Sequence, residues 1–247
     1  MKRSEFGKIV RKIKESIDEE KMWGAAEAML LESRNKHLSA RAGKAEVKKT
    51  GAGSPGTLAA YKKKIEGCTM CPLGRTRINF VFGVGNPAAR LMFVGEGPGY
   101  DEDRAGEPFV GRAGQLLTKI IEAMGMRRED VYIANIVKCH PMTDPSNPDK
   151  RGNDRPPTPE ETSACLPYLE HQIGLINPAI ICTLGNSAAR TLLKSDQGIS
   201  KLRGRFVEYR GIRLMPTYHP AALLRNPSLK KDVWEDMKKI VAALNAG

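Results

Sequence analysis

The chain has 247 residues, enough for one sizeable α/β core with an appendage, so a second full domain is unnecessary. Its 40 Lys and Arg against 28 Asp and Glu give a net charge of +12, which favours a polyanionic partner. Nucleic acid is the first candidate for that partner and an anionic membrane surface is the second. No apolar run is long enough to span a membrane and the charged N-terminus has no signal-peptide core, so we expect a cytoplasmic protein without membrane association, and a monomer by default.

The first 56 residues are predicted to lie outside the main domain. From Ser4 to Ser33, apolar residues recur at helical spacing among charges, which predicts one or two amphipathic helices. Residues Arg34 to Gly56 lose apolar content and end in a Gly-rich stretch, which is typical of a flexible basic linker. We therefore expect a helical appendage and linker over residues 1–56 and a main domain over residues 57–247. The basic appendage could add affinity for DNA, but a solvated helix or a partner-binding arm explains the same residues.

Apolar runs and helical patterns alternate along the main domain. Four apolar runs are predicted to be buried strands, at Arg90–Val94, Val131–Val137, Ala179–Leu184 and Ile212–Thr217. Helical patterns lie between and after them, at Gly114–Met124, Pro159–Ile176, Ser187–Leu193 and Leu229–Leu244. This alternation predicts a three-layer α/β/α sandwich with a central, mostly parallel four-stranded sheet. Because ligands bind beyond the carboxyl ends of the strands in such sheets, we expect the chemistry in the loops that follow the four strands.

Four of the five cysteines form a candidate metal site. Cys68 and Cys71 precede the first strand, Cys139 ends the second and Cys165 lies in the next helix. Four thiolates suit an iron–sulfur cluster or zinc, and their scatter over three elements is more typical of iron–sulfur, although a chance pair with two core thiols is an alternative. A cluster this far from the catalytic loops is predicted to be structural. Cys182, inside a strand, is predicted to be a small buried hydrophobe.

The loop after the first strand, Gly95 to Asp103, is rich in glycine and acid. Glycines let a ligand approach the backbone closely, but Pro98 and four acidic side chains argue against a pyrophosphate cradle. Acids beside a close backbone indicate the positioning of a water or a cation. Farther along, Phe109 and Arg112 precede a helix N-terminus, where the aromatic ring could stack on a base and the arginine could hold phosphate.

Two polar residues stand near the ends of other strands. Asn135 interrupts the apolar second strand and His219 follows the fourth. An amide near a strand's carboxyl end can pair with a base edge, because it offers a donor and an acceptor side by side. A lone histidine is more often structural than catalytic, and a lone Asn in a strand is commonly a satisfied core group, so each residue also has a structural interpretation.

Several of these segments resemble one known family. The segments, in the family's order, are Gly95–Gly99 with Glu102 and Asp103, Pro108–Leu117, Asn135–Cys139, Pro159–Glu161 with Cys165, and His219–Pro227. The first two resemble motif 1 of the family 4, iron–sulfur uracil-DNA glycosylases and the segment after it. The resemblance covers the chain from Cys68 to its C-terminus and leaves out the first 56 residues.

The resemblance implies a hydrolase of base excision repair. Such an enzyme is a monofunctional glycosylase that flips uracil out of single- or double-stranded DNA and hydrolyses its N-glycosidic bond, leaving an abasic site. It implies no catalytic lysine and therefore no strand-cleaving lyase activity. It also implies a 4Fe-4S cluster on Cys68, Cys71, Cys139 and Cys165, which their spacing alone does not establish.

Each motif then has an expected role. Phe109 would stack on the flipped uracil, and Asn135 would read its Watson–Crick edge by accepting from N3–H and donating to O4. His219 would stabilise the uracil anion near O2 as the bond breaks. Glu96, with the Gly97 backbone, would place the hydrolytic water and stabilise the cationic sugar.

The remaining candidates concern selectivity and DNA contact. Glu102 is a second candidate for placing the water, or it would crowd the C5 position and exclude thymine. Leu223, Leu224 and Arg225 form a tip suited to filling the gap left by the flipped nucleotide, with an ordinary helix start as the alternative. Arg112 and the nearby amides would contact phosphate.

One stretch, Pro141 to Pro157, looks longer than the family's usual connection, and its Pro, Asn and Asp content predicts a surface loop. A related group that crosslinks itself to the abasic sugar carries a basic loop ending in histidine in this region. Here Lys150 and Arg151 are followed by Gly-Asn-Asp, and His140 comes too early for that role. We therefore expect ordinary turnover.

Three other functions are compatible with parts of the sequence. One is a catalytically silent iron–sulfur DNA-binding module, which the joint presence of Glu96, Phe109, Asn135 and His219 disfavours. Another is a glycosylase with a different damaged-base preference. The third is a zinc-stabilised nucleotide hydrolase, for which the acidic stretch at residues 101–103 is the only support.

Overall fold

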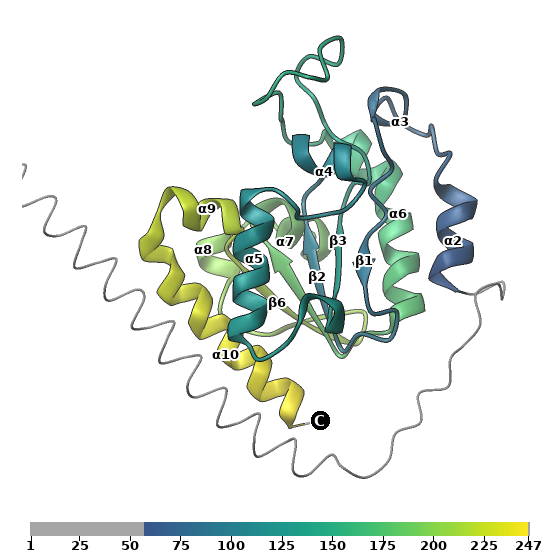
Figure 1. Cartoon of the computed structure of the whole chain (residues 1–247). Helices are drawn as coiled ribbons and strands as arrows, with labels where there is room; N and C mark the ends of the chain where they lie inside the picture. The colour runs from purple at the N-terminus through teal and green to yellow at the C-terminus, as the bar shows by residue number, and fades with distance from the viewer. Residues whose placement is uncertain (1–56, 247) are drawn as a thin grey trace, which may run out of the picture.

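A computed structural model describes residues 57–246. The helical appendage and linker predicted over residues 1–56 lie outside these described residues. The described part is one sheet covered by helices on both faces, which confirms the predicted α/β sandwich (Figure 1). Within it, no helix is both long enough and apolar enough to cross a membrane.

The sheet has six strands in the order β1-β3-β2-β4-β6-β5. The strands are β1 (Val84–Gly85), β2 (Leu91–Gly95), β3 (Tyr132–Asn135), β4 (Ile180–Leu184), β5 (Val207–Tyr209) and β6 (Ile212–Thr217). The four predicted strands form the parallel centre, β3-β2-β4-β6. The predicted count of four is too low, because β1 and β5 add antiparallel edges of only two and three residues, too short to show a hydrophobic period.

The central strands divide their side chains between two cores. Along β2, Leu91 and Phe93 face one core, whereas Met92 and Val94 face the other, as the two-residue period of a strand requires. Every residue of β2, β3 and β4 is buried, which explains why these strands read as continuous apolar runs. Cys182 is fully buried in β4, as predicted.

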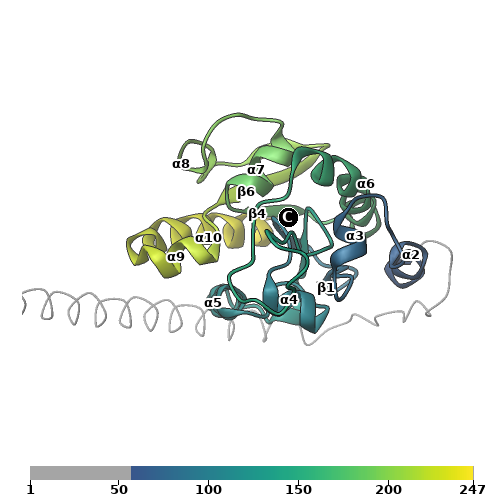
Figure 2. The ribbon, with the colours of Figure 1, turned by 90° about the horizontal axis from the view of Figure 1, so that it is seen from above.

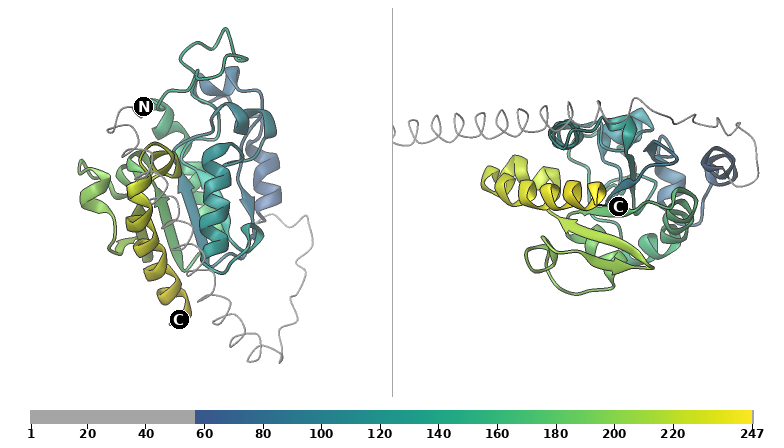
Figure 3. Two further views of the ribbon diagram at one scale, coloured as in Figure 1. Left: turned by 60° about the vertical axis from the view of Figure 1, so that its left-hand side comes forward. Right: turned by 90° about the horizontal axis from the view of Figure 1, so that it is seen from below.

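Helices cover both cores. One face carries α5 (Arg112–Ala123) and α10 (Lys230–Asn245), and the other carries α2 (Leu58–Ile65), α6 (Pro159–Ile176) and α7 (Asn186–Leu193) (Figure 3). The four predicted helices are confirmed to within two residues at each end. Short helices complete the fold: α3 (Leu73–Thr76), α4 (Tyr100–Ala105), α8 (Ile199–Leu202), α9 (Pro220–Arg225), and the 3-10 turns η1 (Arg128–Asp130) and η2 (Pro227–Leu229).

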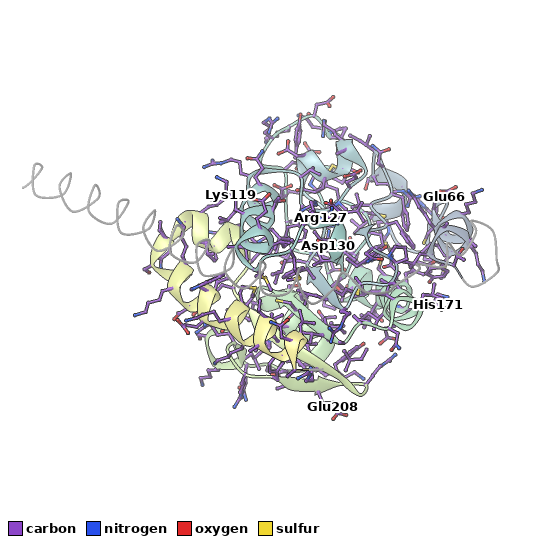
Figure 4. All side chains as sticks on the ribbon, turned by 60° about the horizontal axis from the view of Figure 1, so that its bottom comes forward. Glu66, Lys119, Arg127, Asp130, His171 and Glu208 are labelled. Carbon is purple, nitrogen blue, oxygen red and sulfur yellow. The ribbon has the colours of Figure 1, made fainter. Side chains whose placement is uncertain are left out.

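Local capping explains where two elements begin. At the start of α6, the Thr158 hydroxyl accepts from the Glu161 amide, while the Glu161 carboxylate accepts from the Thr158 amide at 2.8 Å. Before β3, the Asp130 carboxylate accepts from the Arg127 amide at 2.8 Å and pairs with its guanidinium (Figure 4). These contacts fix the start of the helix that leads to β4 and the approach of the chain to β3.

A buried ion pair ties α10 to the carboxyl end of β6. Arg203 donates to both Asp236 oxygens, at 2.8 and 3.1 Å, and the Thr217 hydroxyl donates to the same carboxylate at 2.7 Å. Asp236 is fully buried. Burial raises its pKa, and the bonds from Thr217 and Arg203 oppose that shift. Because Thr217 lies two residues before His219, this network fixes the strand end that carries the histidine.

We predict that Arg203→Met lowers the free energy of unfolding by about 3 kcal/mol, because it leaves the Asp236 carboxylate buried without its guanidinium. The matched control is Arg210→Met, which removes a pair with Glu170 that lies at the surface. That change should cost at most about 1 kcal/mol. Urea denaturation of both variants measures the difference, and equal losses would contradict the importance of the buried pair.

Candidate active site

The candidate residues meet at the carboxyl edge of the sheet. β2 and β3 end in register there, with Gly95 opposite Asn135. The short helices α3, α4 and α9 and the start of α5 lie around this edge (Figure 2). A Cβ on Gly95 would lie 2.4 Å from Asn135 Oδ1 and 2.5 Å from Phe109 Cζ, so only glycine fits. Backbone, amide and aromatic ring therefore share one small space.

Phe109 is held in a strained conformation. Its φ of 56° lies in the left-handed region, which is a rare outlier for a bulky residue. The Glu102 carboxylate clamps the segment, since one oxygen accepts from the Val110 and Gly111 amides at 3.0 Å and the other accepts from Gly99 at 3.2 Å. Both Glu102 oxygens are thus engaged with backbone, an arrangement that favours a positioning role over direct placement of a water.

Asn135 presents an unpaired oxygen. The residue is 1% exposed, and within residues 57–246 its Oδ1 has no hydrogen-bond partner. A buried acceptor left unpaired is costly, so this oxygen indicates a ligand that brings a donor. The ring of Phe109 lies against the same glycine, and its centroid is 5.6 Å from that of His219.

His219 has a defined tautomer. It caps α9, and its Nδ1 accepts from the Ala221 amide at 3.1 Å, so the proton of the neutral ring is on Nε2. Burial, with the positive charge of Arg225, lowers the pKa of His219 to about 4. The ring is therefore neutral at pH 7 and offers one N–H donor. Gly185, at φ 91°, leaves room for it, because a Cβ there would lie 2.9 Å from His219 Cβ.

Glu96 is half-buried at the start of the loop after β2. Burial raises the pKa of its carboxyl group above the ordinary range. Its backbone carbonyl accepts from the Val137 amide at 3.1 Å, but no described residue makes a hydrogen bond or ion pair with its carboxylate. The neighbouring Gly97 is closely packed, since a Cβ there would lie 2.7 Å from Val137. The carboxylate is thus available for a water or for positive charge.

The predicted DNA-contact residues separate into two groups. Leu223 is 1% exposed and packs in the core, which corrects its assignment to the tip. The reason is helix geometry, because neighbouring residues on α9 point about 100° apart. Leu224 is 42% exposed and Arg225 is also exposed, so these two form the tip. Arg112, the first residue of α5, is exposed as well.

The long loop from Pro141 to Pro157 has a buried base. His140 is fully buried, with Nε2 2.7 Å from Asp154 and Nδ1 3.6 Å from Asp103. Burial acts to lower its pKa, but the two carboxylates outweigh that effect and raise it to about 9. Sequence reasoning assigned no role to Asp103, whose carboxylate also accepts from the Ile78 and Asn79 amides. His140 thus anchors the loop to α4.

The four candidate cysteines converge from three segments. Cys139 and Cys165 are buried, and Cys68 and Cys71 are half-buried. Burial raises the pKa of Cys139 to about 12, and the nearby thiols of Cys165 and Cys71 add to that shift. Three of the sulfurs accept a hydrogen bond. The Lys138 amide donates to Cys165 at 3.3 Å, the Arg77 guanidinium to Cys139 at 3.4 Å, and the Tyr168 hydroxyl to Cys68 at 3.2 Å. Among the described residues, no three His, Cys, Asp or Glu side chains are grouped as a site for a metal ion.

A family model for the uracil DNA glycosylase superfamily matches residues 82–238. A type-4 uracil-DNA glycosylase of Thermotoga maritima is 46% identical over 72% of this chain and 89% of its own length. The chain belongs to this superfamily and to its type-4 family. A further type-4 uracil-DNA glycosylase, from Archaeoglobus fulgidus, is 42% identical over 72% of this chain and 88% of its own. A type-5 uracil-DNA glycosylase of Thermus thermophilus is more distant, at 29% identity over 54% of the chain.

The Glu102 clamp can be tested by Glu102→Gln, which puts an amide donor where backbone amides need acceptors. We expect the free energy of unfolding in urea to fall by about 1–3 kcal/mol. The control is Glu107→Gln, at an exposed carboxylate on the same segment, which should change stability little. Unchanged stability in Glu102→Gln would contradict the clamp and favour the direct contact with the base predicted from the sequence.

Proposed function

We propose that the chain is a uracil-DNA glycosylase, which flips uracil out of DNA and hydrolyses its N-glycosidic bond to leave an abasic site for base excision repair. The observation that carries this proposal is the unpaired, buried Oδ1 of Asn135, beside the Phe109 ring and near a neutral His219. The names of the type-4 relatives support uracil in DNA as the substrate. A monomer stays a prediction.

Asn135 would select uracil by hydrogen-bond direction. Its Oδ1 accepts from uracil N3–H and its Nδ2 donates to O4, while the Phe109 ring stacks on the base. Cytosine has a bare N3 and a 4-amino group, so it would leave both ends of the amide unpaired in a buried place. Because a buried unpaired polar group costs about 1–3 kcal/mol, this mismatch disfavours cytosine.

His219 and Glu96 would then stabilise opposite charges. As the glycosidic bond breaks, negative charge develops on uracil O2 and positive charge on the sugar. The Nε2–H of the neutral His219 donates to the anion, while Nδ1 stays on the Ala221 amide. The Glu96 carboxylate lies free of other partners within the described chain, so it holds the attacking water and stabilises the cationic sugar.

DNA contacts would lie on α9 and at the start of α5. Leu224 fills the gap that the flipped nucleotide leaves, and the exposed Arg225 and Arg112 hold phosphates. Leu223 supports the tip from the core instead.

We propose that Cys68, Cys71, Cys139 and Cys165 hold a 4Fe-4S cluster. The donor set fits, because the thiols are soft ligands from three segments and N–H or O–H groups are aimed at three of the sulfurs, as thiolates require. The four thiols lie near one another, since Cys71 and Cys165 add to the raised pKa of Cys139, and Cys71 and Cys68 add to that of Cys165. Bound there, it would supply a structural link between the segment before β2, the end of β3 and α6.

Excision from an oligonucleotide with one labelled uracil, followed by alkaline cleavage, tests the function. We expect iron-loaded wild-type protein to cut, His219→Ala to lose about 10²–10³-fold in kcat, and Asn135→Asp to lose most of its uracil excision. The controls are His171→Ala, at an exposed histidine on α6 (Figure 4), and Asn147→Asp, in the exposed loop. No cleavage of single or double strands by iron-loaded wild type would leave a silent DNA-binding module as the better account.

The pH dependence of kcat/KM tests the role of Glu96. Its pKa is raised, and its active form is the carboxylate, so activity should fall as the pH drops through that raised pKa. His219, with a pKa of about 4, stays neutral over this range and does not cause the loss. Glu96→Gln should lower kcat/KM by about 10²-fold and remove this acid limb. Glu107→Gln should keep it, and an unchanged limb in Glu96→Gln would assign the titration elsewhere.

A further inference from the structure

Lys138 is a buried lysine to which the catalytic scheme assigns no role. It is fully buried between the end of β3 and Cys139. Its Nζ donates to the backbone carbonyl of Asn135 at 2.8 Å, and its own amide donates to Cys165 Sγ at 3.3 Å. Its carbonyl accepts from the Val81 amide at 2.9 Å. Within residues 57–246, no carboxylate pairs with it.

Burying an ammonium group costs free energy unless hydrogen bonds inside the protein compensate for its lost hydration. An apolar side chain of similar length would fill the same volume without that cost, but it would not bond the Asn135 carbonyl. The bond spans the bend from Asn135 to Lys138, where β3 ends and the Ile136 and Val137 amides make the last hydrogen bonds to the β2 segment, at the Gly95 and Glu96 carbonyls. It therefore fixes the backbone from which the Asn135 amide projects.

We propose that Lys138 is a positioning residue that joins the cysteine site to the base-reading amide of Asn135. Its two ends make two different contacts: the backbone amide bonds a sulfur on α6, and the ammonium bonds the carbonyl of the reading residue. When Cys165 is held by the cluster, the Lys138 backbone is held too, and the amide of Asn135 is kept at the angle that matches uracil. This inference rests on the proposed function.

Arg77 provides a matched comparison. Its guanidinium also donates to a sulfur of the cysteine site, Cys139 Sγ, but its other hydrogen bonds go to the backbone carbonyls of Cys68 and Glu66, both at 2.6 Å. It thus contacts the cysteine site without reaching Asn135. Removing Arg77 should affect the cluster alone, whereas removing the Lys138 ammonium should affect base reading alone.

The test compares Lys138→Met and Arg77→Met with wild type for iron and sulfide content, visible absorption, kcat, KM, and inhibition by free uracil. Lys138→Met should keep its iron, bind free uracil about tenfold more weakly and lose about tenfold in kcat/KM, since a small misplacement is costly. Lys138→Gln, which restores a shorter donor, should recover part of the uracil affinity. Arg77→Met should lose iron, with unchanged uracil affinity in the fraction that remains loaded.

Two results would overturn the inference: unchanged uracil affinity in iron-loaded Lys138→Met, or loss of iron from that variant, which would make Lys138 a residue of the cluster alone. Failure of the proposed function is a separate result. That failure would appear in the wild type itself: the iron-loaded protein would neither excise uracil from DNA nor bind free uracil.

Discussion

The site depends on the absence of a side chain at Gly95, where two parallel strands end side by side. Any Cβ there would overlap both the Asn135 amide and the Phe109 ring. Because β2 and β3 are held in register by the sheet, this crowding cannot be relieved by sliding one strand past the other. The amide and the ring are therefore fixed relative to each other by the core of the protein rather than by a mobile loop.

The same constraint explains the strain at Phe109. The Phe109 ring lies against the end of β2 while its own backbone adopts a left-handed conformation. The Glu102 carboxylate accepts hydrogen bonds from three backbone amides in that region. Strain of this kind persists where surrounding contacts over-determine the local structure. The acidic loop that follows β2 thus has divided tasks, with Glu102 and Asp103 bonded to backbone and Glu96 left available to a ligand.

Sequence patterns predicted the elements that are long enough to show a continuous or periodic apolar pattern. The four central strands and four main helices carry continuous or 3.6-residue apolar patterns, so their positions could be predicted to within a few residues. β1 and β5 could not, because two or three half-exposed residues carry no period. The placement of Leu223 in the core and Leu224 outside depends on the exact start of a six-residue helix, which the sequence leaves open by one or two positions.

The buried polar groups were the hardest part of the site to foresee. His140 joins Asp103 and Asp154, which lie 37 residues before it and 14 residues after it, and no local pattern brings the three together. Lys138 did carry a signal, since a lysine between Val137 and Cys139 interrupts an apolar run. A lysine at the end of a buried strand either extends its ammonium group into solvent or buries it in hydrogen bonds with the protein. Only the fold distinguishes these two arrangements.

The alternation of Leu223 and Leu224 on α9 has a consequence for how the surface can change. Leu223 is buried in the core that also contains residues of α5 and α10, while Leu224 is 42% exposed. The surface of α9 beside the site can therefore vary in size or polarity at one position without disturbing the core. A fluorescent label attached at position 224 would occupy the place proposed for the DNA gap, and would leave intact the side chain that holds the helix in place.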